Sequence, residues 1–175
     1  MKRHWIAGVA VSCLMAGVAL GVASQRMAGI DTIRGKPAKE AGLAALTAAE
    51  QLAGDGSWER IAVGRVYYLS GDKTRGQAIF DAVTSGKQNG GDWQRIGEVY
   101  AAAGDTKQAN ESFKKMLDLN PKDDTGQAEV GAWYIRTGDR AKGEELFAKA
   151  FQRHPDEVWH YVRAAEALLG VPAGR

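Results

Sequence analysis

The chain has 175 residues, of which 45% are hydrophobic and 25% charged. This composition excludes a disordered chain and a polytopic membrane protein, and the length suits one domain with a single core. Of the 23 Lys and Arg residues, Lys2 and Arg3 lie at the start, which leaves 21 basic residues against 21 acidic ones. No basic run in that remainder predicts nucleic acid as a partner.

The first 24 residues have the pattern of an export segment. A short basic start is followed by WIAGVAVSCLMAGVALGVAS, residues 5–24, and no further charge appears before Arg26. This pattern predicts a secretory signal with a small-residue cleavage site at residues 22–24. A helix of that length, about 30 Å, would also serve as an uncleaved membrane anchor. Both alternatives predict a periplasmic location, either released or tethered to the inner membrane with the basic start in the cytoplasm.

The single cysteine, Cys13, lies inside this apolar run. If the segment is cleaved, the mature chain has no cysteine and therefore no disulfide, so its stability must come from packing. Residues 25–37 contain Gly29, Gly35 and Pro37 without apolar periodicity, and we interpret them as a flexible tether. From residue 38 onward the apolar spacing is helical, and no stretch alternates long enough to predict a strand.

The strongest feature of the remaining chain is a repeated segment. GRVYYLSGD at 64–72, GEVYAAAGD at 97–105 and GAWYIRTGD at 131–139 keep Gly, Tyr and Gly-Asp at fixed places. Each segment predicts the end of one helix, where Gly adopts the left-handed conformation and Asp caps the helix that follows. In the middle copy, Gln108 is placed to complete a capping box with Asp105. The repeats span residues 57–89, 90–123 and 124–157.

This pattern resembles the tetratricopeptide repeat, a 34-residue helix-turn-helix unit with Trp, Leu, Gly and Tyr in its first helix and Ala, Phe, Ala and Pro in its second. The middle copy matches best, with Met116 where the family prefers Ala. Its matching residues are Trp93, Ile96, Gly97, Tyr100, Ala109, Phe113 and Pro121. The resemblance implies an all-α fold, an α-solenoid of about three repeats. The alternative is a helical bundle without repeats.

The resemblance also implies how the helices of each unit pack. Small residues would allow the two helices to cross closely, the repeat tyrosines would fill the space between helices, and the repeat phenylalanines would join one unit to the next. The small residues are Gly64, Gly97 and Gly131 on the first helices and Gly76, Ala109 and Gly143 on the second. The tyrosines are Tyr67, Tyr100 and Tyr134, and the phenylalanines are Phe80, Phe113 and Phe147.

Both ends of the array carry a single extra helix. Residues 38–54 resemble a lone second helix that covers the first unit, because Gly42, Leu46 and Ala49 lie 34 residues before Gly76, Phe80 and Val83. Residues 158–170 resemble a capping helix, with Ala165 in the place of the repeat glycine. Stacked repeats need such caps at their ends.

The sequence contains no constellation that predicts catalysis, a metal site or a cofactor. His4 lies in the export segment, and we expect His154 and His160 at the surface, since no metal-binding spacing joins them. There is no nucleophile elbow and no phosphate-binding loop. The chain is therefore predicted not to be an enzyme.

Without a predicted catalytic, metal or cofactor site, the functional feature that we expect is a surface that binds another protein. In the family, first helices line a concave groove that takes an extended peptide or a partner helix. Carried over by position, the groove residues here would be Arg65, Tyr68, Leu69, Gln94, Glu98, Ile135 and Arg136. Ile61, Ala101, Ala128 and Ala132 share that face but equally suit packing against neighbouring helices. The clamp with which chaperone-binding members grip a terminal carboxylate is absent, because Ile61, Arg65 and Arg95 replace its Lys and Asn residues.

The predicted function is thus that of a scaffold or assembly factor of the bacterial envelope, which holds a protein segment in its groove. The alternative is a permanent structural subunit of a larger complex, or a self-assembling array without a peptide ligand. The sequence leaves the partner and the oligomeric state open.

Overall fold

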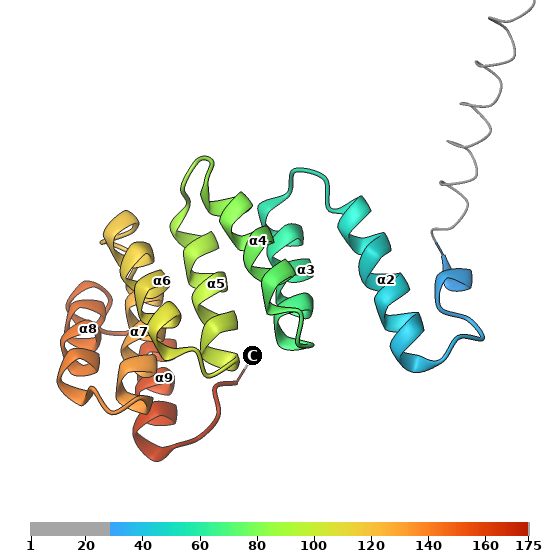
Figure 1. The fold of residues 1–175 in the computed structure, drawn as a ribbon. Helices are drawn as coiled ribbons and strands as arrows, with labels where there is room; N and C mark the ends of the chain where they lie inside the picture. The colour runs from blue at the N-terminus through green and yellow to red at the C-terminus, as the bar shows by residue number, and fades with distance from the viewer. Residues whose placement is uncertain (1–28, 175) are drawn as a thin grey trace, which may run out of the picture. The chain divides into compact units, whose positions relative to one another are not determined.

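The structure, a computed structural model, describes residues 29–174, and the chain divides after Gly54 into two compact units (Figure 1). The predicted signal or anchor, residues 1–24, lies outside the described residues. Within residues 29–174 there are eight α-helices, one short 3-10 helix and no strand, as the prediction of an all-α fold requires. No helix in this described part has the length and apolar character needed to cross a membrane.

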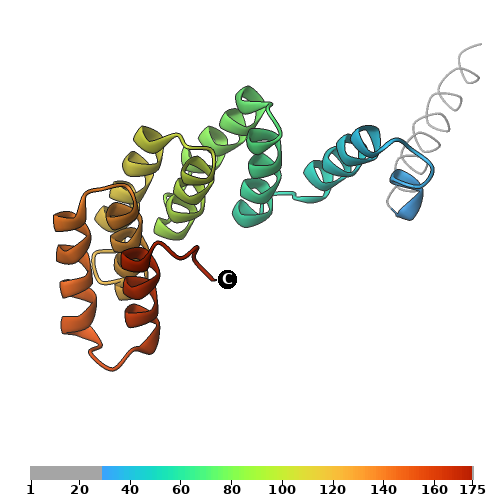
Figure 2. The same ribbon diagram turned by 90° about the horizontal axis from the view of Figure 1, so that it is seen from below.

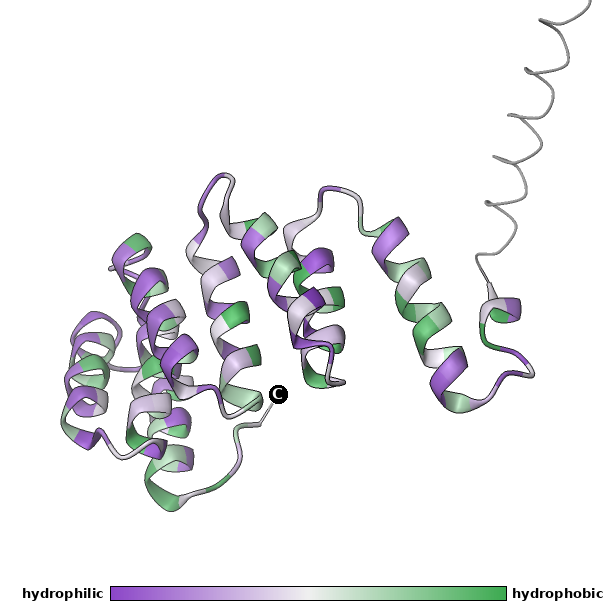
Figure 3. Cartoon of the chain, in the orientation of Figure 1, coloured by the Kyte–Doolittle hydropathy of each residue, from purple (hydrophilic) through white to green (hydrophobic). Residues whose placement is uncertain are grey.

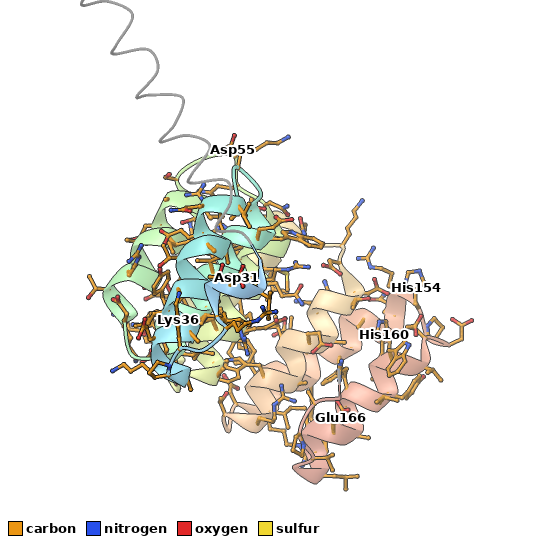
Figure 4. All side chains as sticks on the ribbon, turned by 90° about the vertical axis from the view of Figure 1, so that its right-hand side faces the viewer. Asp31, Lys36, Asp55, His154, His160 and Glu166 are labelled. Atoms are coloured by element: carbon orange, nitrogen blue, oxygen red, sulfur yellow. The ribbon has the colours of Figure 1, made fainter. Side chains whose placement is uncertain are left out.

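The first unit contains the 3-10 helix η1 (Ile30–Thr32) and the helix α2 (Ala38–Leu52). The Lys36 ammonium donates to the Thr32 carbonyl at 2.7 Å, which closes the turn after η1; Lys36 and Asp31 are labelled in Figure 4. The segment predicted as a tether therefore contains a turn of helix. Pro37 stands at the N-cap of α2, where its fixed φ is compatible with helix entry.

The second unit is a row of helical hairpins. Its helices are α3 (Ser57–Leu69), α4 (Lys73–Thr84), α5 (Gly90–Ala102), α6 (Thr106–Leu119), α7 (Asp124–Arg136), α8 (Arg140–Arg153) and α9 (Val158–Leu169). The hairpins are α3–α4, α5–α6 and α7–α8, and α9 packs chiefly on α7 (Figures 1 and 2). We call α3, α5, α7 and α9 the first helices, and α4, α6 and α8 the second helices.

The turn inside each hairpin follows the Gly-Asp prediction with one exception. Gly71, Gly104 and Gly138 have φ values of 109°, 77° and 95°, a region that a side chain would strain. Asp72 and Asp139 then cap α4 and α8 by accepting a hydrogen bond from a backbone amide of the first turn.

Asp105 is the exception, and the prediction that it caps α6 in a box with Gln108 is wrong. Its side chain makes no capping hydrogen bond. The carboxylate instead accepts from the Tyr68 hydroxyl at 2.8 Å and from the Lys73 ammonium at 2.7 Å. Both donors belong to the preceding hairpin, so Asp105 joins two neighbouring hairpins.

The predicted close crossing of the two helices in each hairpin is confirmed. A Cβ added at Gly64 would lie 2.6 Å from the Phe80 ring, and one added at Gly97 would lie 2.6 Å from the Phe113 ring. At Gly131 the nearest atom would be the Gly143 carbonyl oxygen, at 3.0 Å. Real Cβ atoms do not approach a neighbour at 2.6 Å, so a ring takes the space that a side chain would need.

A continuous core runs along the three hairpins. The three repeat tyrosines are buried, as predicted. Phe80 contacts Tyr68 of its own hairpin and Tyr100 of the next, each with ring centroids 5.8 Å apart, which confirms the predicted bridging role of this phenylalanine. Hydrophilic residues are coloured purple in Figure 3 and follow the outer faces of the second helices.

Candidate protein-interaction face

Most of the predicted groove residues are accessible on one side of the first helices. Ile135 is an exception: it packs on α8, where a Cβ added at Gly143 would lie 2.5 Å from its Cγ1, so its assignment to the groove is wrong. Arg65, Glu98 and Arg136 are exposed, and Leu69 is 39% exposed. Gln94 and Ile135 are half-buried. We call the exposed and half-buried residues of α3, α5, α7 and α9 on this side the first-helix face.

Tyr68 does not belong to this accessible set, and the expectation that it faces a ligand is wrong. It is 4% exposed and packs on Phe80 and Tyr100. Burial, together with its hydrogen bond to Asp105, raises the pKa of the Tyr68 hydroxyl. The hydrogen bonds that Asp105 accepts, first the one from Lys73 and second the one from Tyr68, hold the pKa of its carboxyl below the usual value. Ile61, Ala128 and Ala132 are also buried. Of their two predicted roles, lining the groove or packing against neighbouring helices, the structure therefore supports packing.

An ionic cluster occupies the part of this face formed by α5, α7 and α9. The Gln94 amide donates to Glu98 at 3.2 Å, while Arg163 of α9 bonds to Glu129 of α7. Although Glu98 as a whole is exposed, neighbouring atoms displace water from around its carboxyl group, and this desolvation raises its pKa. The hydrogen bond from Gln94 and the charges of Arg95 and Arg163 oppose the rise, whereas the Glu129 carboxylate adds to it. Charged side chains of α5, α7 and α9 therefore lie close enough to affect the pKa of Glu98.

Glu166 closes the cluster at the C-terminal end. It accepts from the Arg163 guanidinium at 2.7 Å and from the Gly174 amide at 3.0 Å. These donors, the Gly174 amide above all, keep the pKa of Glu166 below its usual value. Glu166 is labelled in Figure 4, on the same helix as His160. The C-terminal segment is thus held against the edge of the first-helix face.

Sequence reasoning missed Glu129, Arg163 and Glu166 as members of this face. A usable signal existed, because Arg95, Glu129 and Arg163 lie 34 residues apart and therefore occupy one position of successive repeats with alternating charge. In the sequence, Arg95 stands out only as a departure from the carboxylate clamp. Its guanidinium lies 3.5 Å from the ring centroid of Trp58, a cation–π contact that joins α5 to α3.

The histidines differ from the prediction in one respect. His154 is exposed as expected and pairs with Asp124, and this hydrogen bond lowers the pKa of the Asp124 carboxyl. His160 is only 1% exposed, so its expected surface position is wrong; its Nε2 lies 3.4 Å from the same carboxylate (Figure 4). Within residues 29–174 no group of His, Cys, Asp and Glu side chains could hold a metal ion.

A pocket lies between α4, α5 and α6, lined by residues of all three helices. It has a volume of about 650 Å³ and a floor formed by Trp93, Ile96 and Tyr100 of α5. Lys114 and Asp118 stand among the charged residues of both signs on its walls. The Trp93 indole N–H is buried there without a hydrogen-bond partner among the described residues.

Comparison with known proteins supports the repeat assignment. Residues 93–123 match the family model of the tetratricopeptide repeat. No curated protein matches the chain. The crystal structure of MamA aligns with 75% of this chain and 80% of its own, with a TM-score of 0.55 and 15% identity.

The crystal structure of YrrB, described as a TPR protein with an unusual peptide-binding site, aligns with 88% of this chain and 84% of its own, with a TM-score of 0.50 and 16% identity. At such identities the likenesses show the fold. The repeat match over residues 93–123, the stacked hairpins with their glycine crossings and both structural likenesses agree on the fold of an array of tetratricopeptide repeats.

Proposed function

We propose that this protein is a scaffold that binds a segment of another protein on its first-helix face. The observation that carries the proposal is the row of accessible charged side chains along the first helices. Arg65 and Glu98 share one repeat position, and Arg95, Glu129 and Arg163 share another. A face that served only to pack against another helix would be apolar, as the buried positions Ile61, Ala128 and Ala132 are.

The chemistry of the face favours a partner segment of mixed character. Arg65 and Arg136 supply positive charge, and Glu98 supplies negative charge between them along the row of first helices. Leu69 and Trp58 add exposed apolar surface on α3. An extended peptide or a helix that carries both charges and at least one large apolar side chain suits this combination better than a purely acidic tail.

The proposed place of action is the periplasm, either in solution or at the inner membrane. The support is the sequence of residues 1–24, whose basic start and uncharged run are typical of a signal or anchor. Mass measurement of the native protein would distinguish removal of residues 1–24 from their retention. Protection of the second unit from protease in intact cells, and digestion after the outer membrane is opened, are the results expected for export.

Site-specific photo-crosslinking in living cells tests the binding face. A photoreactive residue at Arg65, Gln94 or Arg136 should capture one common partner. The same probe at Lys107, whose side chain is 86% exposed on α6, serves as the matched control and should not capture that partner. Charge reversal by Arg65→Glu should then weaken the crosslink formed at Arg136 at least several-fold, whereas Lys107→Glu should leave it unchanged. Equal capture from Lys107 would place the binding surface elsewhere.

A structural-subunit role is the second candidate, and one observation favours it. Val158, Trp159 and Leu169 on the terminal helix α9 are all more than half exposed. Apolar surface of this kind on an end helix is typical of a permanent contact. A purified protein that sediments as a stable oligomer without any ligand would favour this role over peptide binding.

A further inference from the structure

The ionic cluster of α5, α7 and α9 contains three carboxylates, and Glu98 is the one that has no ion pair among the described residues. Arg163 pairs with Glu129 and donates to Glu166 at 2.7 Å. The Glu98 carboxylate accepts a hydrogen bond from the uncharged Gln94 amide at 3.2 Å, and no cation of the described chain lies within ion-pair distance of it. The charge of Glu98 is therefore not compensated by a direct contact within the described molecule.

The two arginines whose charges influence Glu98 are held by other groups. The Arg95 guanidinium lies 3.5 Å from the ring centroid of Trp58 and donates to the Gly91 carbonyl oxygen at 3.2 Å. Arg163 is held by its two glutamates, and its side chain is only 17% exposed. Either arginine would have to give up these contacts to reach Glu98. The local cations thus stabilise the packing of the first helices and leave this carboxylate without a partner.

The corresponding positions of the neighbouring repeats supply no cation to Glu98. On α7 this position is occupied by Ala132, which carries no charge and has a side chain too short to contact a neighbouring helix surface through a polar group. On α3 it is occupied by Arg65, which forms no ion pair with any described residue. Glu98 itself is exposed, so a cation from another molecule can reach it.

The surroundings of the Glu98 carboxylate favour such a cation. Desolvation by neighbouring atoms raises the pKa of Glu98, and the nearby Glu129 carboxylate raises it further, against the lowering effect of the Gln94 hydrogen bond. An added positive charge would offset both unfavourable influences. A partly desolvated carboxylate also attracts an opposite charge more strongly than a fully hydrated one, because the effective dielectric around it is lower.

We propose that Glu98 receives a lysine or arginine side chain of the bound protein segment, and that this contact selects the segment. The inference rests on the proposed binding of a protein segment to the first-helix face, and it names the side chain that the segment must carry. Exposed charges such as Arg136, at the end of α7, should contribute less to selection, because water and salt screen them.

Peptide selection on the purified full-length chain tests the inference before a natural partner is known. The probe is a display library of random peptides, and the chain is kept in mild detergent. Peptides selected by the unaltered chain should be enriched in Lys and Arg relative to the starting library. Glu98→Gln should lose this enrichment, and Glu98→Arg should select Asp and Glu instead. Glu111→Gln, the same change on α6 at a side chain that is 67% exposed, is the matched control and should keep the enrichment.

A double-mutant cycle then identifies the contact. One selected peptide is made with its recurring basic residue and with Gln in that place, and calorimetry gives the dissociation constants for the unaltered chain and for Glu98→Gln. Either single change should weaken binding at least about tenfold, and the two together should weaken it no more than one alone, because both remove the same pair. Arg136→Gln should weaken binding less than about fivefold. Because Glu98 is exposed, its substitution should leave the circular dichroism spectrum unchanged.

The outcomes separate this inference from the proposed function. A photoreactive residue at Arg136 shows which selected peptides bind on the first-helix face. Peptides that crosslink there without a preference for Lys or Arg would overturn the role of Glu98 and leave binding on the face intact. Additive losses in the cycle would overturn it as well, since they place the basic side chain against another group. If no selected peptide crosslinks at Arg136, the proposed binding face is wrong and the inference falls with it.

Discussion

Asp105 does not cap its own helix but forms hydrogen bonds with residues of the preceding hairpin. Its equivalents Asp72 and Asp139 cap the second helices of their hairpins. In the middle hairpin the carboxylate bonds instead to Tyr68 and Lys73 of the preceding hairpin. A buried tyrosine hydroxyl without a partner would cost free energy, and the Asp105 carboxylate satisfies it with a charge-assisted bond. The aspartate is present in all three copies, but in the middle copy it joins two hairpins instead of capping a helix.

We expect Tyr68→Phe to lower the free energy of unfolding at pH 7 by about 1–2 kcal/mol, because it removes a hydrogen bond to a charged group. The pKa of Asp105 is lower in the folded protein than its unfolded value of about 3.9. The stabilisation is therefore complete above that pH and is lost as the pH falls through the lower folded pKa. Urea unfolding of both proteins between pH 7 and pH 3 should show the difference shrink.

Tyr100→Phe is the matched control for this measurement. Its hydroxyl donates to the neutral Gln77 side chain at 2.8 Å. The loss, about 0.5–1.5 kcal/mol, should not change over the same pH range, since the acceptor does not titrate. A pH-independent effect for both variants would show that Asp105 does not govern the Tyr68 contact.

At the scale of elements, the glycine crossings determine how each hairpin packs. Gly64 and Gly97 each face the ring of a phenylalanine from the partner helix, and that ring is nearly inaccessible to solvent. Burial of such a side chain contributes about 1.5–3 kcal/mol, which a helix could not gain if a Cβ held the ring away. The unfavourable helix propensity of glycine, about 1 kcal/mol, is smaller than this gain.

Two glycines of the same helix provide a direct test. Gly97→Ala should destabilise the protein by about 1–3 kcal/mol, because the new methyl group would lie 2.6 Å from the Phe113 ring. Gly91→Ala should be neutral or stabilising by up to about 1 kcal/mol, since its Cβ would meet its nearest neighbours at 3.5 Å. Thermal unfolding of both variants measures the difference. Equal melting temperatures would refute the close crossing.

The sequence allowed us to predict the contacts that recur in every repeat, but not the contacts that occur in one repeat only. Gly97 and Phe113 could be placed against each other because three copies demand the same contact. The Tyr68–Asp105 bond could not, since Ala101 and Ile135 stand at the position of Tyr68 in the other two copies and cannot make the same bond. The burial of His160 likewise depends on packing at the end of the stack, beside Phe151, for which no second copy offers a comparison.

For the whole molecule, an array gains stability from each interface between neighbouring repeats. The terminal helix α9 has such an interface with the α7–α8 hairpin, where Arg163 pairs with Glu129 of α7 and Tyr161 stacks on Phe151 of α8. On its other side, Leu168 and Leu169 remain in water. In the structural-subunit role, association of copies through this apolar side would cover these leucines, so the melting temperature should then depend on protein concentration.

We expect the melting temperature of the unaltered chain to rise by about 4 °C for each tenfold increase in concentration above the dissociation constant. The reason is that each tenfold excess of a binding partner adds about 1.4 kcal/mol to the stability of the folded state. Leu168→Glu should abolish this dependence, because it places a charge in the exposed apolar face of α9. Leu119→Glu, at the exposed end of α6, carries the same change outside that face and should retain the dependence. A melting temperature that stays constant over a hundredfold range, measured by scanning calorimetry, would exclude association through the ends of the array.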